Sequence, residues 1–189
     1  MARDRTVTGF DPSDKGFFHG GDLAGLTQRL DYIKGLGTTA VWLTPVMRNQ
    51  PVQGAGTDAS AGYHGYWITD FTTVDPHLGS NADLRALVAA AHALGMKVYL
   101  DIIVNHTADV IHSADGGTAY VYTGMAPYRD ASGKAFDPKA FAGQATFPTL
   151  TAGGSFPRVP VVDPAAAQAK TPAWLNDVTM YHNRGDSTF

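Results

Sequence analysis

The sequence predicts an α/β fold, because helix and strand patterns alternate over its first hundred residues. A strand, a helix and a second strand at this spacing are typical of a right-handed parallel crossover. The composition agrees with a globular protein, since 44% of the 189 residues are hydrophobic and 16% are charged.

The first helix is predicted to begin after Asp22, which is placed to cap it, and to end at Gly35–Gly37. Its apolar residues recur at spacings of three and four: Leu23, Leu26, Leu30, Ile33 and Leu36. The next segment, Ala40–Leu43, is continuously apolar and stops before Pro45. Such a run suits a short strand that is covered on both faces.

The second helix is predicted to start near Ser80 or Asn81 and to end at Gly95. Its inward positions are Leu84, Leu87, Val88, Ala91 and Leu94. Lys97–Val104 follows as a second buried strand, because it is rich in β-branched residues and almost uninterrupted.

Beyond His106 the pattern changes, and we predict a boundary between residues 1–106 and 107–189. Seven of the eleven prolines lie in the second part, which has no sustained helical period. An irregular stretch of this length is uncommon in a compact domain unless it forms a functional lobe.

Composition excludes several classes of protein. The net charge is −3 with no basic cluster, which predicts no nucleic-acid partner. No apolar run approaches the ~18 residues of a membrane span, and the N-terminus has no signal-peptide core. There is no cysteine, which excludes disulfides and thiol catalysis. All 17 acidic residues are aspartates, so a mechanism that needs a glutamate cannot be completed by this chain.

Polar residues gather at the predicted carboxyl ends of the strands, where parallel α/β folds bind their ligands. Asp101–His106 (DIIVNH) places a carboxylate in the second strand, and Gly62–Trp67 (GYHGYW) lies in the long loop after the first. A buried aspartate needs a partner, and the amide oxygen of Asn105 is a hard ligand suited to Ca²⁺. The alternative interpretation is structural, with a hydrogen-bonded His106 and aromatic residues that only pack the loop.

Several motifs in the same order resemble the N-terminal half of the alpha-amylase family, glycoside hydrolase family 13. They are His19–Leu26 (HGGDLAGL), Leu43–Val46 (LTPV), Tyr63–Asp75 (YHGYWITDFTTVD), Leu84–Gly95 and Lys97–His106. The tail Trp174–Phe189 resembles the small lobe inserted after the third barrel strand. Among relatives, the match is most like secreted bacterial alpha-amylases and the amylase half of amylopullulanases.

The resemblance implies a partial (β/α)₈ TIM barrel, about strands 2–3 with flanking helices, in residues 1–106. Residues 107–189 would be the incomplete start of the inserted lobe. It also implies retaining hydrolysis of α-glucosidic bonds in starch-like glucans. The family's catalytic Asp, Glu and Asp follow later strands, so no catalytic residue is assigned, and this N-terminal fragment is predicted to be inactive alone.

The resemblance implies roles for single residues in binding α-glucan or maltooligosaccharide. Tyr66 matches the tyrosine that stacks beneath the sugar at the cleavage point, and Trp67 matches its neighbour in the cleft wall. His106 matches a histidine that hydrogen-bonds the same sugar, and His64 a histidine at the cleft rim. Asp101 matches a carboxylate that organises the active-site arginine.

The resemblance also implies structural calcium in the complete enzyme. Asn105 matches a side-chain ligand of the Ca²⁺ that joins barrel and lobe, and Asp163 and Asp177 are candidate ligands from the lobe. Gly20 and Asp22 match a second calcium site found in some relatives. A secreted, extracellular location is expected from the family.

Other hypotheses remain open at this point. A debranching enzyme of pullulanase type, acting on α-1,6 bonds, or a transglycosylating member of the family would share these motifs. A relative that only binds sugar or assists assembly belongs to a different class. A doubly wound α/β binding protein is disfavoured, because neither strand is followed by a glycine-rich phosphate loop.

Overall fold

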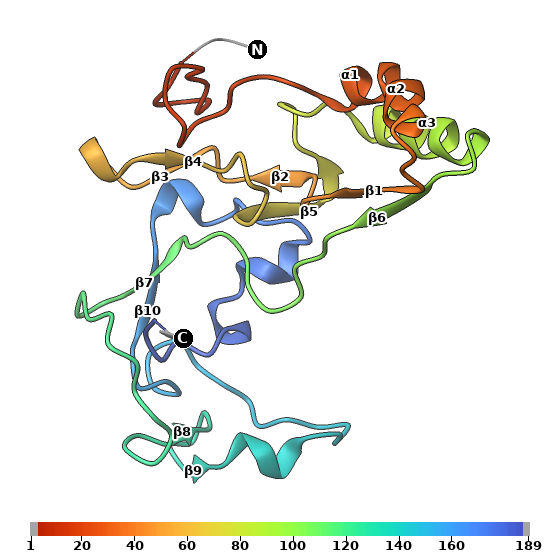
Figure 1. Ribbon diagram of the computed structural model, residues 1–189. Coiled ribbons are helices and arrows are strands. Elements are labelled where there is room, and N and C mark those ends of the chain that lie inside the picture. The colour runs from red at the N-terminus through yellow and green to blue at the C-terminus, as the bar shows by residue number, and fades with distance from the viewer. Residues whose placement is uncertain (1–3, 187–189) are drawn as a thin grey trace. The chain divides into compact units, whose positions relative to one another are not determined.

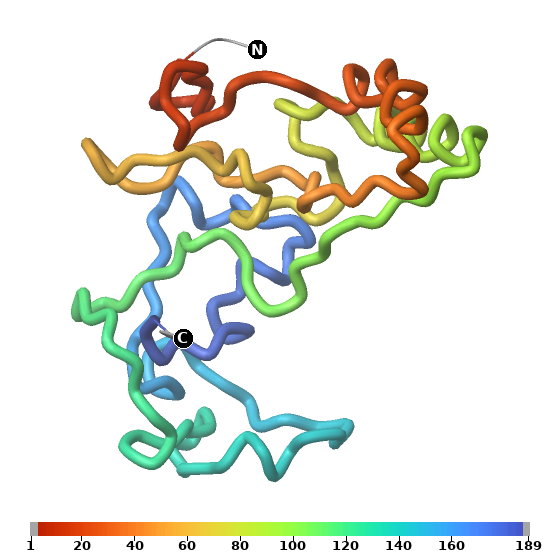
Figure 2. The backbone as a smooth tube through the Cα atoms, viewed as in Figure 1, coloured from red at the N-terminus to blue at the C-terminus, as the bar shows by residue number. Residues whose placement is uncertain are grey.

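The computed structural model describes residues 4–186. The chain divides into two compact units, Met1–Ala108 and Asp109–Phe189. Figure 1 labels their elements, and Figure 2 follows the backbone of the first unit from red into green and of the second from green into blue. Over residues 4–186, no helix combines the length and apolar character of a membrane span.

The first unit contains the predicted parallel crossover. Strand β1 (Ala40–Leu43) pairs in parallel with β6 (Lys97–Leu100), with Ala40 opposite Lys97 and Leu43 opposite Leu100. Helix α3 (Asn81–Ala93) precedes β6 and connects to it through a short turn (Figure 1). Ser80 and Asp83 form a reciprocal capping box at the start of α3, which fixes where this helix begins.

The predicted first helix is present as two pieces, α1 (Leu23–Gln28) and α2 (Leu30–Gly35). The side chain of Asp22 caps α1 as expected, accepting a hydrogen bond from the N–H of Gly25 at 2.6 Å. The interruption at Arg29 follows Thr27, whose hydroxyl donates to the carbonyl of Leu23 at 2.7 Å. Such a bond to the preceding turn bends a helix.

Two expectations about the strands are wrong. The second strand ends at Leu100 rather than at Val104, because its partner β1 ends at Leu43, and the last ladder bond joins the N–H of Asp101 to the Leu43 carbonyl. Asp101, predicted to lie inside this strand, is therefore the first residue after it. Trp42 is 75% exposed and Tyr99 is 51% exposed, so the described residues leave part of this strand pair uncovered.

The segment between Pro45 and Ser80, predicted as a loop, contains short strands. Strand β2 (Met47–Asn49) pairs antiparallel with β5 (Ile68–Val74), with register shifts on both sides of Arg48. A small hairpin of β3 (Val52–Gln53) and β4 (Ser60–Ala61) lies between them and encloses the short 3₁₀ helix η1 (Gly56–Asp58).

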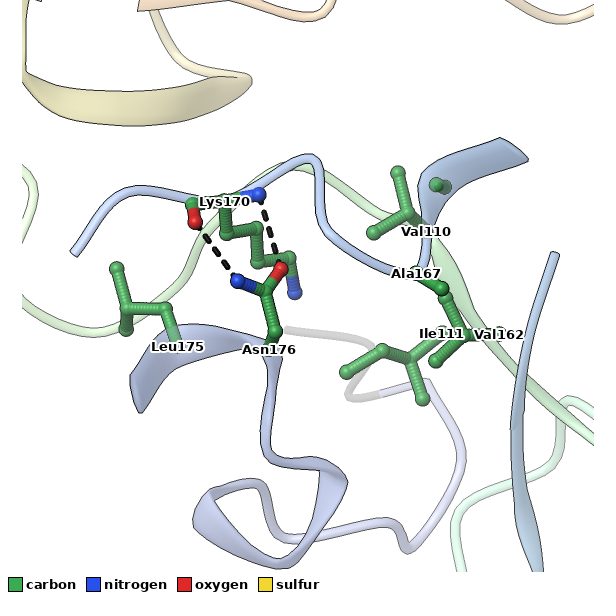
Figure 3. A pocket seen from close by; sticks show the side chains of 8 residues that line it. Val110, Ile111, Val162, Ala167, Lys170, Leu175 and Asn176 are labelled. Carbon is green, nitrogen blue, oxygen red and sulfur yellow. Dashed lines mark hydrogen bonds between the residues drawn. The ribbon is translucent and has the colours of Figure 1, made fainter. Parts of the chain in front are cut away.

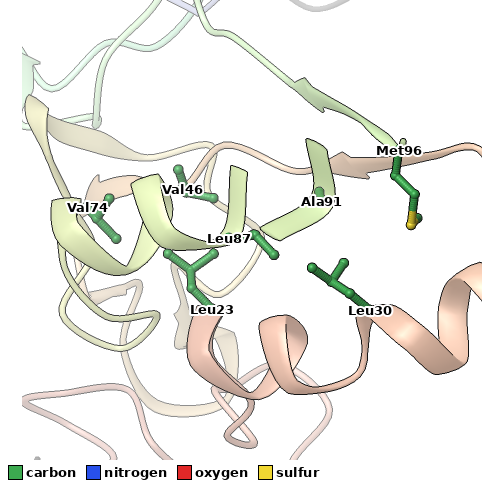
Figure 4. Packing of buried hydrophobic residues seen from close by; sticks show 7 residues of the cluster. All are labelled: Leu23, Leu30, Val46, Val74, Leu87, Ala91 and Met96. Carbon is green, nitrogen blue, oxygen red and sulfur yellow. The ribbon is translucent and has the colours of Figure 1, made fainter. Parts of the chain in front are cut away.

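The core of the first unit lies between the helices and the strands (Figure 4). Its buried members are Leu23, Leu30, Val46, Val74, Leu87, Ala91 and Met96. The predicted inward positions Leu26, Ile33, Leu84 and Leu94 pack against this cluster. Leu36, also predicted to face inward, is 65% exposed, because α2 ends one residue before it.

The second unit has no α-helix within its described residues, 109–186. Its strands pair antiparallel: β7 (Ile111–Ser113) with β10 (Pro160–Val162), and β8 (Tyr128–Arg129) with β9 (Ala135–Phe136). The remaining elements are the 3₁₀ helices η2 (Pro138–Phe141), η3 (Pro164–Ala166), η4 (Ala173–Asn176) and η5 (Val178–Met180). Part of its interior is formed by aromatic side chains around Tyr128. The guanidinium of the buried Arg184 lies 4.0 Å from the Tyr128 ring.

Candidate functional site

The backbone of segment Gly62–Trp67 packs closely against the backbone that follows β1, at Pro45 and Gln50. Gly65 has a φ of +86°, and a Cβ there would collide with the carbonyl oxygen of Pro45. A Cβ at Gly62 would lie 2.5 Å from the carbonyl oxygen of Gln50. Glycine is therefore required at both positions, and the backbone contact fixes where the intervening aromatic residues project.

His64 organises the aromatic side chains of this segment. Its ring stacks on Tyr66, with 5.6 Å between centroids, and meets Trp67 edge-on at 4.5 Å. The backbone N–H of Tyr66 donates to Nδ1 of His64 at 3.0 Å, so Nδ1 carries no proton. Burial lowers the pKa of His64, which agrees with a neutral ring.

Tyr66 connects this segment to the end of β6 through two hydrogen bonds. Its hydroxyl donates to Oδ2 of Asp101 at 2.9 Å, and this bond raises the pKa of Tyr66. Its carbonyl lies 3.0 Å from Nε2 of His106. Because a carbonyl oxygen only accepts, Nε2 of His106 carries the proton and donates.

The structure thus brings together the five residues predicted to bind substrate: His64, Tyr66, Trp67, Asp101 and His106. They lie where the parallel strands end. The site presents aromatic rings together with a carboxylate and an imidazole, which is a combination that suits a polyhydroxylated ligand with apolar faces.

Two further residues support the site and received no role from the sequence. The side-chain oxygen of Asn49 accepts the backbone N–H of Trp67 at 2.6 Å. The carboxylate of Asp75 accepts the backbone N–H of Asn49 at 2.9 Å. Both residues are only 4% exposed. The signal that could have found them is a polar residue at the end of a strand pattern, as Asn49 ends β2 and Asp75 follows β5, and this signal is weak.

The calcium candidates of the first unit lie in two places, after β6 and before α1. Asn105 lies on an exposed bend after β6. Asp22 is engaged as the cap of α1, and Gly20 adopts a φ of +101° just before it. Carbonyl and carboxylate oxygens are the ligand types that Ca²⁺ takes.

The calcium candidates of the second unit are Asp163 and Asp177. Asp163 is exposed, 3.8 Å from Nε2 of His112. Asp177 caps η5 by accepting hydrogen bonds from the N–H and hydroxyl of Thr179 at 2.9 and 2.7 Å. Between residues 4 and 186, no three His, Cys, Asp or Glu side chains gather so that they could hold a metal ion together.

A hollow in the second unit is lined mainly by apolar side chains, including Val110, Ile111 and Val162 (Figure 3). Its polar neighbours bond to one another. The backbone N–H of Lys170 donates to Asn176 Oδ1 at 2.9 Å, and Asn176 Nδ2 donates to the Lys170 carbonyl at 2.8 Å. The Lys170 ammonium donates to the Tyr181 hydroxyl at 3.0 Å. These groups are satisfied internally, so the hollow has the character of packing rather than of a ligand site.

Comparison with known proteins identifies the family. Residues 4–142 match the model of the alpha-amylase catalytic domain, and the chain therefore belongs to the alpha-amylase family. The resemblance found in the sequence is confirmed. The chain is 58% identical to the alpha-amylase of Streptomyces lividans over 186 residues, which cover 98% of this chain and 20% of that protein.

Two further relatives support the assignment. The periplasmic alpha-amylase of Escherichia coli is 44% identical over 96 residues, 49% of this chain and 14% of its own. The crystal structure of a cyclomaltodextrin glucanotransferase with a three-domain ABC distribution aligns with 64% of this chain and 26% of its own, at 37% identity and a TM-score of 0.51. The chain thus spans only about a fifth of the length of the Streptomyces relative.

Proposed function

We propose that this chain is the glucan-binding part of a retaining alpha-amylase-type glycoside hydrolase, and that the complete enzyme hydrolyses α-glucosidic bonds in starch-like glucans. The observation that carries the proposal is the hydrogen-bonded cluster of Tyr66, Asp101 and His106 at the end of the β1–β6 pair. In parallel α/β folds, ligands bind at this end of the strands.

Each residue of the cluster has a task in this proposal. The ring of Tyr66 stacks on the sugar at the cleavage point, and its hydroxyl is oriented by Asp101. The hydrogen bond to Tyr66 uses Nε2 of His106, and we assign Nδ1 of this exposed ring to a sugar hydroxyl. His64 and Trp67 extend the wall of the site. We assign no acid/base to the chain, because it has no glutamate, and no nucleophile, because the family's catalytic Asp follows a later strand.

The fold of the complete enzyme is part of the proposal. We infer that β1 and β6 are two adjacent strands of a (β/α)₈ barrel, with residues 1–106 in the barrel and 107–189 in the inserted lobe. Support comes from the parallel pairing and from the exposed side chains of Trp42, Tyr99 and Ile102, which further strands and helices would cover.

Calcium coordination by Asn105 also belongs to the proposal. Its amide oxygen is a hard ligand, and its exposed position after β6 leaves it open to a cation. In the proposal, the remaining ligands come from the inserted lobe and from the rest of the complete enzyme. In the complete enzyme, we expect Asn105→Ala to abolish the fall in melting temperature that a chelator causes.

We further propose a location outside the cytoplasm, as the name of the periplasmic Escherichia coli relative suggests.

The test is a chimera in which this chain replaces the segment that it matches in the Streptomyces lividans alpha-amylase. We expect the chimeric amylase to release reducing sugars from soluble starch with retained anomeric configuration, measured by NMR. Activity confined to pullulan would indicate a debranching enzyme. A folded chimera that binds maltotriose without turnover would overturn the hydrolase proposal in favour of a sugar-binding relative.

A further inference from the structure

The backbone of Trp67 is fixed on both sides by the end of strand β2. Its N–H donates to Oδ1 of Asn49 at 2.6 Å, and its carbonyl accepts from the N–H of Gln50 at 2.7 Å. Both polar backbone groups of this residue are therefore used, which restricts the direction in which its ring projects.

Asn49 uses its amide group in both directions. While Oδ1 accepts from Trp67, Nδ2 donates to the carbonyl of Met47 at 2.6 Å. The side chain is buried, so neither bond is exchanged for one to bulk water. An ionised aspartate of the same shape would keep the acceptor but lose the donor, and would present an oxygen to the Met47 carbonyl.

Asp75 in turn fixes the backbone of Asn49. Its Oδ2 accepts a hydrogen bond from the backbone N–H of Asn49 at 2.9 Å. Its Oδ1 accepts one from the backbone N–H of His77 at 2.9 Å and one from ring Nδ1 of His77 at 2.7 Å. Burial alone would raise the pKa of Asp75, but the hydrogen bonds from His77 and Asn49 hold it below its ordinary value. The His77 ring stacks on Phe18 at 3.9 Å, so this support is anchored in the interior.

We propose that Asn49 is a positioning residue for the glucan site, oriented by Asp75 and acting through the backbone of Trp67. This inference rests on the proposed function, because it assigns Asn49 to the same site. Trp67 adjoins Tyr66, which has its own bonds to Asp101 and His106. Asn49 therefore holds the aromatic pair in one arrangement before sugar arrives, which lowers the cost of ordering it on binding.

The test compares Asn49→Asp and Asn49→Ala with Asn81→Asp in the chimeric amylase. Asn81 is a matched control, because its side chain also accepts one backbone N–H, from Val74 at 2.8 Å, and donates to one carbonyl, of Thr72 at 3.0 Å. We expect the Asn49 variants to lose about tenfold in kcat/KM for maltotriose when they are assayed well below their melting temperatures. The control should lower the melting temperature while KM and kcat stay within about twofold.

A double-mutant cycle with Trp67→Ala separates positioning from a general structural effect. If Asn49 acts through Trp67, Asn49→Asp costs less kcat/KM in the Trp67→Ala background than alone. Additive losses, or equal kinetic losses in the Asn81→Asp control, would overturn the inference while the proposed function stands. A folded parent chimera that neither binds nor hydrolyses maltotriose would instead overturn the proposed function and this inference with it.

Discussion

Tyr66 combines two contacts that separate variants can distinguish. Its hydroxyl bonds to the Asp101 carboxylate, whereas its ring face is the part assigned to the sugar. Its backbone carbonyl accepts a hydrogen bond from His106, and a substitution of the side chain does not remove this carbonyl. A substitution of the Tyr66 side chain therefore removes the ring and the bond to Asp101, but leaves the backbone bond to His106 in place.

Replacing Tyr66 by alanine and by phenylalanine should give different losses in the chimeric amylase. We expect Tyr66→Ala to lower kcat/KM for maltooligosaccharides by about 100-fold, because stacking acts at the reacting sugar. Tyr66→Phe keeps the ring and should lose only about tenfold. Steady-state kinetics together with a melting curve test this. If Tyr66→Ala reduces stability and activity in proportion, the ring packs the loop rather than binding sugar.

Asp75 gives the folded protein a pH dependence with a definite sign. Its pKa lies below the ordinary value of 3.8, so the unfolded state binds more protons at acid pH. The stability that Asp75 contributes is complete above that ordinary value and is lost as the pH falls through the lower, folded pKa.

We expect Asp75→Asn to lower the free energy of unfolding at pH 7 by about 1–3 kcal/mol, because an amide nitrogen replaces one acceptor of a buried cluster. Below pH 4, the difference between wild type and variant should shrink. Urea unfolding of the chimeric amylase from pH 7 to pH 3 measures this. A difference that is constant over the whole range would remove Asp75 from the acid-sensitive groups.

At the scale of elements, local patterns predict those parts whose stability is local. The periodicity of α3 and its capping residues give its position, and the two apolar runs identify β1 and β6. Strands β2 and β5 are not predicted from local patterns. Strand β2 has only three residues, and its pairing with β5 shifts register on both sides of Arg48.

The difference between local patterns and long-range contacts also explains which site residues could be predicted from the sequence. Tyr66 and His106 are recognisable because their motifs resemble those of a family, and the structure places them in contact although 40 residues separate them. Asn49 and Asp75 act through backbone groups 18 and 26 residues away. No local pattern specifies such a contact, so their role depends on the folded chain.

Gly65 tests how strongly the aromatic segment depends on its backbone contact. Gly65→Ala places a Cβ against the Pro45 carbonyl at a φ of +86°, so we expect a loss of at least about 2 kcal/mol in unfolding free energy. Gly95 is a matched control, because it has a φ of +69° and open space around a Cβ, and its alanine variant should lose only about 1 kcal/mol. Urea unfolding compares the two. Equal losses would show that the contact with Pro45 is unimportant.

At the scale of the whole molecule, the β1–β6 pair is a sheet with open edges and uncovered apolar residues. Trp42, Tyr99, Leu100, Ile102 and Val104 are all exposed on or beside these two strands. Two strands of this kind cannot bury both of their faces, and open edges with apolar neighbours favour association between copies. In the described residues, the proposed glucan site therefore lies beside a strand pair that is incompletely covered.

We expect the isolated 189-residue chain to associate, to melt without a sharp transition and to hydrolyse no starch, whereas the chimeric amylase melts cooperatively. Both expectations follow from the proposed function, in which the remainder of the domain covers the β1–β6 pair and supplies the catalytic carboxylates. Sedimentation velocity, calorimetry and a reducing-sugar assay on the two proteins measure the three properties. A second form of the isolated chain, with Trp42→Thr and Ile102→Thr, should associate less without gaining activity. A monomeric wild-type chain with a sharp thermal transition would show that these strands need no further cover, and starch turnover by it would contradict the assignment of catalysis to residues outside this chain.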